Sequence, residues 1–307
     1  MSLTVVGSIA FDSVTTPFGA RERMLGGSAV HFALAASFFT DVNVVGPVGD
    51  DFGPDEHEIL SRRGVDTSDI EHVAGGRTFY WRGHYDHDMN VAHTDETQLN
   101  VFADFEPKLS PRSRDAEMLF LGNIQPDLQR RVRTQSSAGL AALDSMNLWI
   151  DTARESLVAA IGEIDCLLLN DAELRMLTSE PNLVHAARAT MEMGPSVIVA
   201  KRGEYGAVLF TDDGFFAIPG LPLEEVRDPT GAGDSFAGGF LGYLDGVRVD
   251  GGPDDRALRQ AMAYGSVMAS FNVEDFGTGR LAGLDGSEVA ERLAAFKRLT
   301  HFDADPA

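Results

Sequence analysis

Several features that define common protein classes are absent from this 307-residue sequence or rare in it. It has one cysteine, Cys166, so no internal disulfide can form and a cage of cysteine ligands around a metal is excluded. Cys166 lies in an apolar run and is expected in the core. No apolar run approaches the roughly 20 residues that span a bilayer, and no basic segment of a signal peptide precedes the first strand pattern. We therefore expect a soluble, cytoplasmic protein that has no membrane partner.

Positive charge is also scarce. Lysine and arginine total 25 against 47 aspartates and glutamates, which gives a net charge of −22, and the only lysines are Lys108, Lys201 and Lys297. Such a surface repels nucleic acid and anionic lipid, so neither is expected as a partner. We hypothesise that the acidic, lysine-poor composition reflects a salty cytoplasm.

The order of apolar runs along the chain predicts an α/β protein. Strand patterns lie at 3–9, 42–48, 118–121, 148–150, 166–169 and 197–200, and helical patterns lie at 28–39, 54–63, 126–135, 233–244, 254–271 and 287–298. Such alternation is typical of a doubly wound, mostly parallel sheet that is flanked by helices. With no long linker or internal repeat, residues 1–307 are expected to form a single domain.

One section departs from this alternation. Residues 78–101 alternate aromatic and polar side chains, which predicts antiparallel strands. Together with the segment at 11–24, they predict a small β-strand lid, inserted as segments of about 11–25 and 75–103. Phe79 and Trp81 share a strand face, where they either stack on a sugar ring or base or simply pack. Dimerisation through the exposed lid edge is left open.

The stretch with the clearest chemical meaning runs from Asp228 to Asp234 and opens a helical pattern. Gly231, Ala232 and Gly233 leave their backbone N–H groups uncovered at a helix N-terminus, where the helix dipole favours negative charge. We expect an anion hole for a phosphoryl group there. Asp234 is placed to accept a proton from an attacking hydroxyl, so we predict that it is the general base. For a shorter motif, a simple capping aspartate would be the alternative.

This turn, Asp-Pro-Thr-Gly-Ala-Gly-Asp, resembles the signature of the PfkB, or ribokinase-like, family of carbohydrate and nucleoside kinases. With the first strand, the Gly26-Gly27 pair and the strand order, the resemblance extends over nearly the whole chain. It implies ATP-dependent transfer of the γ-phosphoryl group to a hydroxyl of a sugar. The alternatives are a nucleoside kinase and a non-catalytic sensor of the same fold. The chain has neither a P-loop motif nor a protein-kinase catalytic loop, which excludes those two classes.

The resemblance also implies where ATP and Mg²⁺ bind. Asn170 and Glu173 match the family's Asn-x-x-Glu motif, whose amide and carboxylate oxygens suit Mg²⁺, although the same pair would also make an ordinary capping box. The expected ATP-binding residues are Lys201, Gly203, Gly206, Asp228 and Thr230. For Lys201, a solvent-exposed position in a hairpin is the alternative. The family often uses K⁺ as well, for which Asp228 and the 272–277 loop are the candidate place.

At the other end of the chain, the resemblance implies a substrate site. Asp12 matches the aspartate that accepts hydrogen bonds from two sugar hydroxyls, as a carboxylate can. The remaining candidates are Gly26, Gly27, Ser28, His31 and Asn123. His31 stands where the family usually has asparagine, and a buried structural histidine is the alternative. His84, Asp86 and Asp88 are metal-ligand types on one strand face, but a lid strand is the preferred interpretation.

Overall fold

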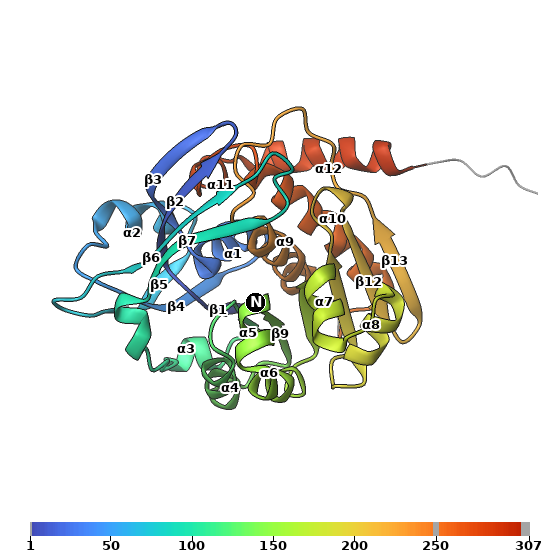
Figure 1. Ribbon diagram of the computed structural model, residues 1–307, viewed down its shortest axis with the longest axis horizontal. Helices are drawn as coiled ribbons and strands as arrows, with labels where there is room; N and C mark the ends of the chain where they lie inside the picture. The colour runs from blue at the N-terminus through green and yellow to red at the C-terminus, as the bar shows by residue number, and fades with distance from the viewer. Residues whose placement is uncertain (1, 248–251, 302–307) are drawn as a thin grey trace, which may run out of the picture.

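The computed structural model describes residues 2–247 and 252–301, which form an α/β layer structure (Figure 1). In this part of the chain, nine strands make one sheet in the order β13-β12-β11-β10-β9-β8-β1-β4-β5. Its strands are β1 (Leu3–Val6), β4 (Val42–Val48), β5 (Asp66–His72), β8 (Met118–Leu121), β9 (Leu140–Asp144), β10 (Cys166–Asn170), β11 (Val197–Lys201), β12 (Ala207–Thr211) and β13 (Gly214–Ile218). All neighbours pair in parallel except β11 with β12 and β12 with β13.

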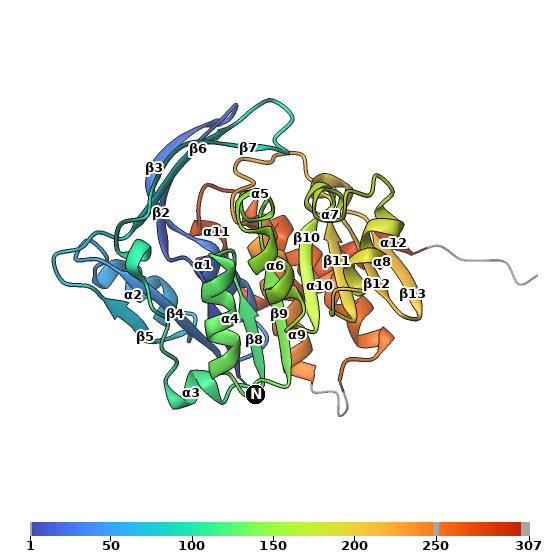
Figure 2. The ribbon, with the colours of Figure 1, turned by 60° about the horizontal axis from the view of Figure 1, so that its bottom comes forward.

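Helices cover both faces of this sheet, as the α/β prediction requires (Figure 2). The helices are α1 (Ser28–Ala36), α2 (Pro54–Ser61), α3 (Pro111–Arg114), α4 (Pro126–Gln135), α5 (Asn147–Thr152), α6 (Arg154–Ile161), α7 (Asp171–Thr178), α8 (Leu183–Met191), α9 (Ala232–Val247), α10 (Asp255–Asn272), α11 (Gly279–Ala282) and α12 (Gly286–Thr300). None of the helices in the described ranges has the length and apolar character that crossing a bilayer requires.

Strand alternation divides the apolar side chains between two cores. Along β10, Cys166 and Leu168 pack with residues of α1, α9 and α10, whereas Leu167 and Leu169 pack with residues of α4, α6 and α7. The strands are therefore buried on both faces, which is why they are continuously apolar in sequence. Cys166 is buried as expected, and burial raises the pKa of its thiol.

A second, smaller sheet lies beyond one end of the main sheet, and the N-terminus lies at the other end (Figure 2). It contains β3 (Gly19–Gly26), β2 (Ala10–Thr16), β6 (Phe79–Tyr85) and β7 (Ala92–Gln98), in that order. The hairpins β2–β3 and β6–β7 are antiparallel, as the sequence predicted. Strands β2 and β6 pair in parallel, because the chain passes through the main sheet between them.

One predicted strand is wrong. Residues 148–150 belong to α5, and the strand that pairs with β8 and β10 is β9, at Leu140–Asp144. The apolar triplet at 148–150 is too short to distinguish a strand from a helix. In α5, Ile150 is buried while Leu148 is exposed, as expected for a helix that lies on a surface.

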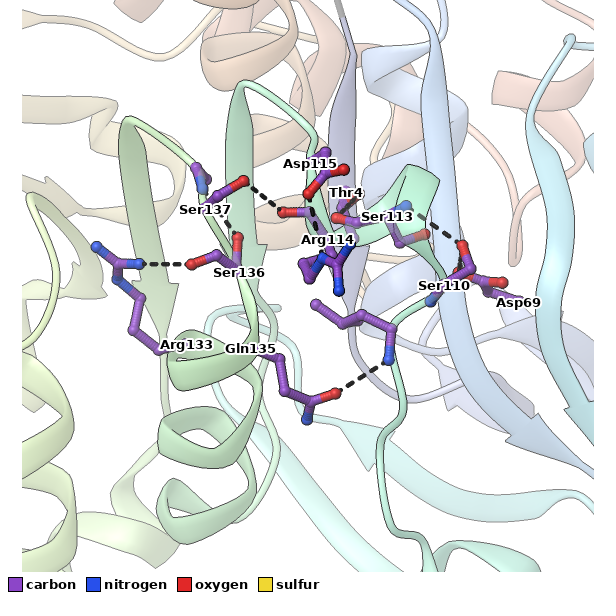
Figure 3. Close-up of polar contacts among 12 residues, drawn as sticks. Thr4, Asp69, Ser110, Ser113, Arg114, Asp115, Arg133, Gln135, Ser136 and Ser137 are labelled. Atoms are coloured by element: carbon purple, nitrogen blue, oxygen red, sulfur yellow. Dashed lines mark hydrogen bonds and ion pairs between the residues drawn. The ribbon is translucent and has the colours of Figure 1, made fainter.

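A polar seam fastens the short helix α3 at the end of the sheet away from the small sheet (Figure 3). The Ser110 side chain caps α3 and donates a hydrogen bond of 2.7 Å from its hydroxyl to Asp69. Thr4 of β1 donates to the carbonyl of Ser113, and the backbone and hydroxyl of Ser137 donate to the carbonyl of Arg114. These contacts join β1, β5 and the α4–β9 connection, so the seam is structural.

Candidate active site

The main sheet brings three polar side chains together at the carboxyl ends of neighbouring strands. Asp144 ends β9, Asn170 ends β10 and Lys201 ends β11. Asn170 and Lys201 are register partners across β10 and β11. In open α/β sheets, ligands bind outside the carboxyl ends of parallel strands, so this edge is where a site is expected.

Helix α9 begins against the same edge, and the turn before it has the predicted form. Gly231 has φ 75°, and a Cβ at that position would lie 2.3 Å from Cγ of His31. Glycine is therefore required there by both backbone conformation and space. The helix starts at Ala232, with Asp234 in its first turn. The small residues thus stand at the positive end of a 16-residue helix.

Lys201 faces this helix start rather than solvent. Its Nζ lies 2.5 Å from Oδ2 of Asp144, and a Cβ at Gly233 would lie 3.0 Å from the same Nζ. The Lys201 side chain is 15% exposed, so the solvent-exposed alternative is wrong. Burial opposes the charged form of Lys201, but Asp144, Glu173 and Asp234 together raise its pKa. The ammonium group therefore stays charged beside the candidate anion hole.

Asp234 has the electrostatic setting of a base that works near neutral pH. Its pKa is raised to about 7, because burial and the charge of Asp144 raise it more than Lys201 and its own backbone N–H lower it. A pKa near the working pH suits general base catalysis, because a substantial fraction of the group is ionised and the ionised form is still basic. The paired charges of Asp144 and Lys201 act on Asp234 in opposite directions.

Asn170 and Glu173 form the capping box that the sequence allowed. Oδ1 of Asn170 accepts a hydrogen bond from the Glu173 backbone N–H, and Oε2 of Glu173 accepts one from the Asn170 backbone N–H. The capping contacts leave the Glu173 carboxyl beside the charged cluster. Burial and the charge of Asp144 raise its pKa to about 7, while Lys201 and Asn170 lower it. Both roles of the pair are therefore compatible.

Gly203 and Gly206 lie in the turn that follows Lys201. Residues Gly203–Tyr205 make a short 3₁₀ turn, and both glycines have positive φ. A Cβ at Gly206 would lie 2.1 Å from the carbonyl oxygen of Ile218, so the turn is packed against β13. At Gly203, a Cβ would lie 3.0 Å from Asn90, in the loop between β6 and β7. The small sheet thus reaches the turn beside Lys201.

The predicted substrate aspartate, Asp12, lies on β2 and faces the Gly26-Gly27 pair. Asp12 is 6% exposed and accepts a hydrogen bond from the Gly27 backbone. A Cβ at Gly26 would lie 2.0 Å from Oδ2 of Asp12, which explains why that position has no side chain. Burial, Asp228 and Asp234 raise the pKa of Asp12 to about 7, against the lowering effect of the Gly27 hydrogen bond. Asp12 therefore belongs to the same electrostatic cluster as the predicted base.

Two candidate substrate residues, Ser28 and Asn123, use polar groups in hydrogen bonds within the protein. Ser28 exchanges hydrogen bonds with Ser8, so that its hydroxyl and backbone tie the end of β1 to the start of α1. Asn123 follows β8, and its Oδ1 accepts a hydrogen bond of 3.0 Å from Nε1 of Trp149 in α5. Both lie at the expected sheet edge, but these contacts alone account for their residue types.

His31 is buried beneath the turn before α9. Its Nδ1 lies 2.8 Å from Oδ1 of Asn272, and the same Oδ1 accepts a hydrogen bond from Ser235. Nδ2 of Asn272 donates to the carbonyl of Thr230. Burial lowers the pKa of His31, although the Asn272 contact and Asp228 oppose this. The His31 ring therefore lies against Gly231 in the turn before α9, and the sequence did not predict its contact with Asn272.

Asp228 fixes the start of the same turn. It is 1% exposed, with Oδ1 accepting from the Thr230 backbone and Oδ2 from the Gly277 backbone. These bonds join the turn to the 272–277 loop, so the two segments named as the candidate K⁺ place lie together. On the small sheet, His84 forms a hydrogen bond with Asp95. The described residues contain no group of three or more histidine, cysteine or acidic side chains that could hold a metal ion by itself.

Sequence reasoning missed three residues of this region. Asp144 lay outside the expected strand, Asn272 carries no local motif, and Tyr85 was read only as part of an alternating strand. Tyr85 reaches the turn before α9, with its hydroxyl 3.2 Å from Oγ1 of Thr230. Only the pairing of distant segments identifies these residues.

Comparisons with known proteins agree with this geometry. The family described as pfkB family carbohydrate kinase matches residues 4–282. The cytidine kinase of Thermococcus kodakarensis is 28% identical over 254 residues, covering 80% of this chain and 90% of that protein. The ATP-dependent ribose-1-phosphate kinase of Halopiger xanaduensis is 30% identical over 281 residues, covering 88% of this chain and 86% of that one.

The fold is also that of solved kinases. The nucleoside kinase of Methanocaldococcus jannaschii superposes with a TM-score of 0.77 at 22% identity, covering 96% of this chain and 98% of that chain. Kinases of this family use ATP, generally with Mg²⁺, and phosphorylate a hydroxyl of a small molecule. Because the family match spans both the small sheet and the turn that starts α9, this chain belongs to the pfkB family of carbohydrate kinases and is an ATP-dependent small-molecule kinase.

Proposed function

We propose that the protein transfers the γ-phosphoryl group of ATP to a hydroxyl held between Asp12 and Asp234, with Asp234 as the general base. The observation that carries the proposal is the position of Asp234, in the first turn of α9 and directly after the small residues Gly231, Ala232 and Gly233. A base that adjoins an anion hole can take the hydroxyl proton as the oxygen attacks the phosphorus. A purely binding protein has no need of such a base.

Lys201 and the start of α9 supply the positive potential in this mechanism. Negative charge on the transferred group would meet the backbone N–H groups of Gly231 and Gly233 and the ammonium of Lys201, whereas the Ala232 N–H already donates to the carbonyl of Pro229. The contact of Lys201 with Asp144 holds the lysine side chain in place beforehand. Thr230, Gly203 and Gly206 remain the other proposed residues of the ATP side, although contacts within the protein already occupy the Thr230 backbone and pack Gly206 against Ile218.

The residues present fit Mg²⁺ held mainly through water and phosphate. Asp144, Glu173 and Asp234 outnumber the Lys201 charge in this cluster, and burial beside like charges raises the pKa of both Glu173 and Asp234. That excess of carboxylates suits a divalent cation, and Mg²⁺ usually keeps several waters. Glu173 and Asn170 are the proposed holders. When bound, the ion neutralises charge on the phosphates.

The same reasoning extends to K⁺ near Asp228. Each carboxylate oxygen of Asp228 accepts one backbone N–H, and a carboxylate has further acceptor capacity. The adjoining 272–277 loop supplies backbone next to it. We include K⁺ beside this loop in the proposal, as a cation that would stabilise the turn before α9.

For the acceptor, charge favours a neutral molecule. The charges that raise the pKa of the Asp12 carboxyl come from Asp228 and Asp234, both acidic. A sugar phosphate bound beside them would be repelled, so a nucleoside or a free sugar fits better. This differs from the ribose-1-phosphate named for one relative.

The small sheet favours a nucleoside over a free sugar. Trp81 pairs with Asp12 across β2 and β6, so the two side chains share a face. The indole lies over Gly83, where a Cβ would meet it at 2.3 Å, and its Nε1 donates to Thr94 of β7. A flat, half-buried ring beside the diol-binding aspartate suits stacking with a base. Relatives named as a cytidine kinase and a nucleoside kinase agree with this choice.

The test is an acceptor panel. ADP release and phosphorylated product are measured with Mg²⁺ and ATP in KCl, using pooled nucleosides, pooled sugars and ribose 1-phosphate in separate reactions. We expect turnover with nucleosides, and Trp81→Ala should raise the nucleoside KM without changing the ATP KM. Turnover with free sugars alone would overturn the choice of nucleoside and support the sugar kinase alternative. Silence in all reactions, with ATP still bound, would favour the sensor.

A further inference from the structure

Tyr85 is the point where the small sheet touches the turn before α9. It is the last residue of β6 and shares the strand face of Trp81 and Gly83, which is the face of Asp12. Its hydroxyl lies 3.2 Å from Oγ1 of Thr230, across 145 residues of sequence. One hydrogen bond therefore connects the end of a lid strand to the residue that precedes the anion hole.

Thr230 is held by its backbone on both sides, and this leaves its hydroxyl to face the small sheet. Its N–H donates to Oδ1 of Asp228, and its carbonyl accepts from Nδ2 of Asn272. The backbone position of the turn is thus set by the core. A second lid residue, Thr16 of β2, donates to the carbonyl of Arg227 at 2.9 Å, so the small sheet meets this turn at two points.

The surroundings of Tyr85 are those of the reacting groups. Asp12, Asp228 and Asp234 all act electrostatically on its hydroxyl, and burial together with these acidic groups raises its pKa. Tyr85 therefore remains a neutral hydrogen-bond donor at any pH where the enzyme works. Tyr85 therefore lies in the same acidic cluster as the groups proposed to hold the acceptor.

We infer that Tyr85 is a positioning residue that latches the small sheet over the acceptor through its hydrogen bond to Thr230. The inference goes beyond the proposed function, on which it rests for the identity of the acceptor. With the latch formed, the acceptor is held between Asp12 and Asp234 and water is kept from the phosphoryl group. With the latch broken, the acceptor is bound more weakly and part of the ATP is hydrolysed by water to ADP and phosphate.

The strand offers a matched control. Tyr80 lies on the opposite face of β6, where its hydroxyl donates to Ser13 and accepts from Arg82. Tyr85→Phe and Tyr80→Phe each remove one hydroxyl from the same strand, but only the first removes a contact with Thr230. A general weakening of the small sheet would affect both variants alike.

The kinetic test uses the best acceptor of the nucleoside panel. In Tyr85→Phe we expect the acceptor KM to rise roughly 2- to 12-fold, the cost of one neutral hydrogen bond, with the ATP KM unchanged. The ratio of ADP released to product formed should rise above that of the wild type. Tyr80→Phe should match the wild type in both. Equal behaviour of the two variants would overturn the latch.

Thr230→Val completes a double-mutant cycle. If the two hydroxyls act as a pair, the double variant should have the same acceptor KM as the single variant that binds the acceptor more weakly. The fold increases of the two single variants then do not multiply. Multiplying effects would overturn the pairing. Thr230→Ser, which keeps the hydroxyl, should retain the wild-type ratio of ADP released to product formed.

Hydrogen exchange of the protein without substrates tests the latch independently of the acceptor. Tyr85→Phe should speed amide exchange both in β6–β7 and in the turn at 228–231, whereas Tyr80→Phe should leave the turn unchanged. Unchanged exchange at 228–231 in Tyr85→Phe would overturn the latch even if the proposed function holds. Faster exchange there without turnover of any nucleoside would support the latch and count against the acceptor.

Discussion

Among single residues, Lys201 and Asp144 provide a test of how the base is tuned. Under the proposed mechanism ionised Asp234 is the active form, so kcat/KM should rise with pH through an apparent pKa near 7 that it shares with Glu173. Lys201 lowers the pKa of Asp234 and Asp144 raises it. Lys201→Met should therefore move the acidic limb to higher pH, and Asp144→Asn should move it to lower pH, each by roughly one unit.

Lys297→Met is the control, because Lys297 is exposed on α12. It should leave the pH profile unchanged. Since Lys201→Met leaves the Asp144 carboxyl buried without its partner, thermal unfolding of each variant must show a folded protein at the assay temperature. Shifts of both variants in the same direction would contradict the assigned influences on Asp234.

At the scale of single residues, the sequence predicted positions that local structure determines and missed positions that depend on packing. Asp234 and Gly231–Gly233 could be identified because one turn and one helix start determine their geometry. The Lys201–Asp144 pair depends on two strands that flank β10. The His31 contact with Asn272 spans 241 residues, so no spacing rule could indicate it.

At the level of secondary structure, the start of α9 sets the geometry of the site. Gly231→Ala would place a methyl group against the His31 ring on a backbone with φ 75°. We expect kcat/KM to fall at least tenfold, roughly the effect of displacing anion-hole donors, and the thermal midpoint to fall as well. Gly286→Ala, at the open start of α12, should be neutral.

His31→Ala in the Gly231→Ala background separates the two causes of this loss. Removing the ring relieves the overlap but not the backbone strain, so activity should recover in part. Wild-type activity in Gly231→Ala alone would show that the turn does not hold the transferred group.

Helices and strands were predicted well where their patterns are long. The periodicity placed α4, α9, α10 and α12, and the apolar runs placed β1, β4, β8, β10 and β11. The error at 148–150 arose because a short apolar run fits both a strand and a helix. Because β9 was not predicted, Asp144 was not placed in the predicted site. The parallel pairing of β2 with β6 depends on the tertiary fold, and no local sequence pattern predicts it.

For the whole molecule, the net charge of −22 predicts a dependence on salt. Repulsion among acidic groups opposes the folded state, and salt screens it. The thermal midpoint should rise between 0.1 M and 2 M KCl, and NaCl should have nearly the same effect. Equal midpoints at low and high KCl would contradict the hypothesis of adaptation to a salty cytoplasm.

Activity separates a specific K⁺ effect from screening. If K⁺ binds beside Asp228, turnover at 0.1 M should be higher in KCl than in NaCl at the same ionic strength. Identical turnover in the two salts would remove K⁺ from the proposal while leaving the roles of Asp234 and Lys201 unaffected.

The measurement that tests the central claim most directly compares the wild type with Asp234→Asn. Product formation from Mg²⁺, ATP and the best acceptor is measured together with ATP affinity. Loss of a general base should lower kcat roughly 10²- to 10⁴-fold, while ATP binding is retained. If Asp234→Asn turns over at the wild-type rate, Asp234 is not the base, and the proposed transfer between Asp12, Asp234 and the start of α9 is wrong.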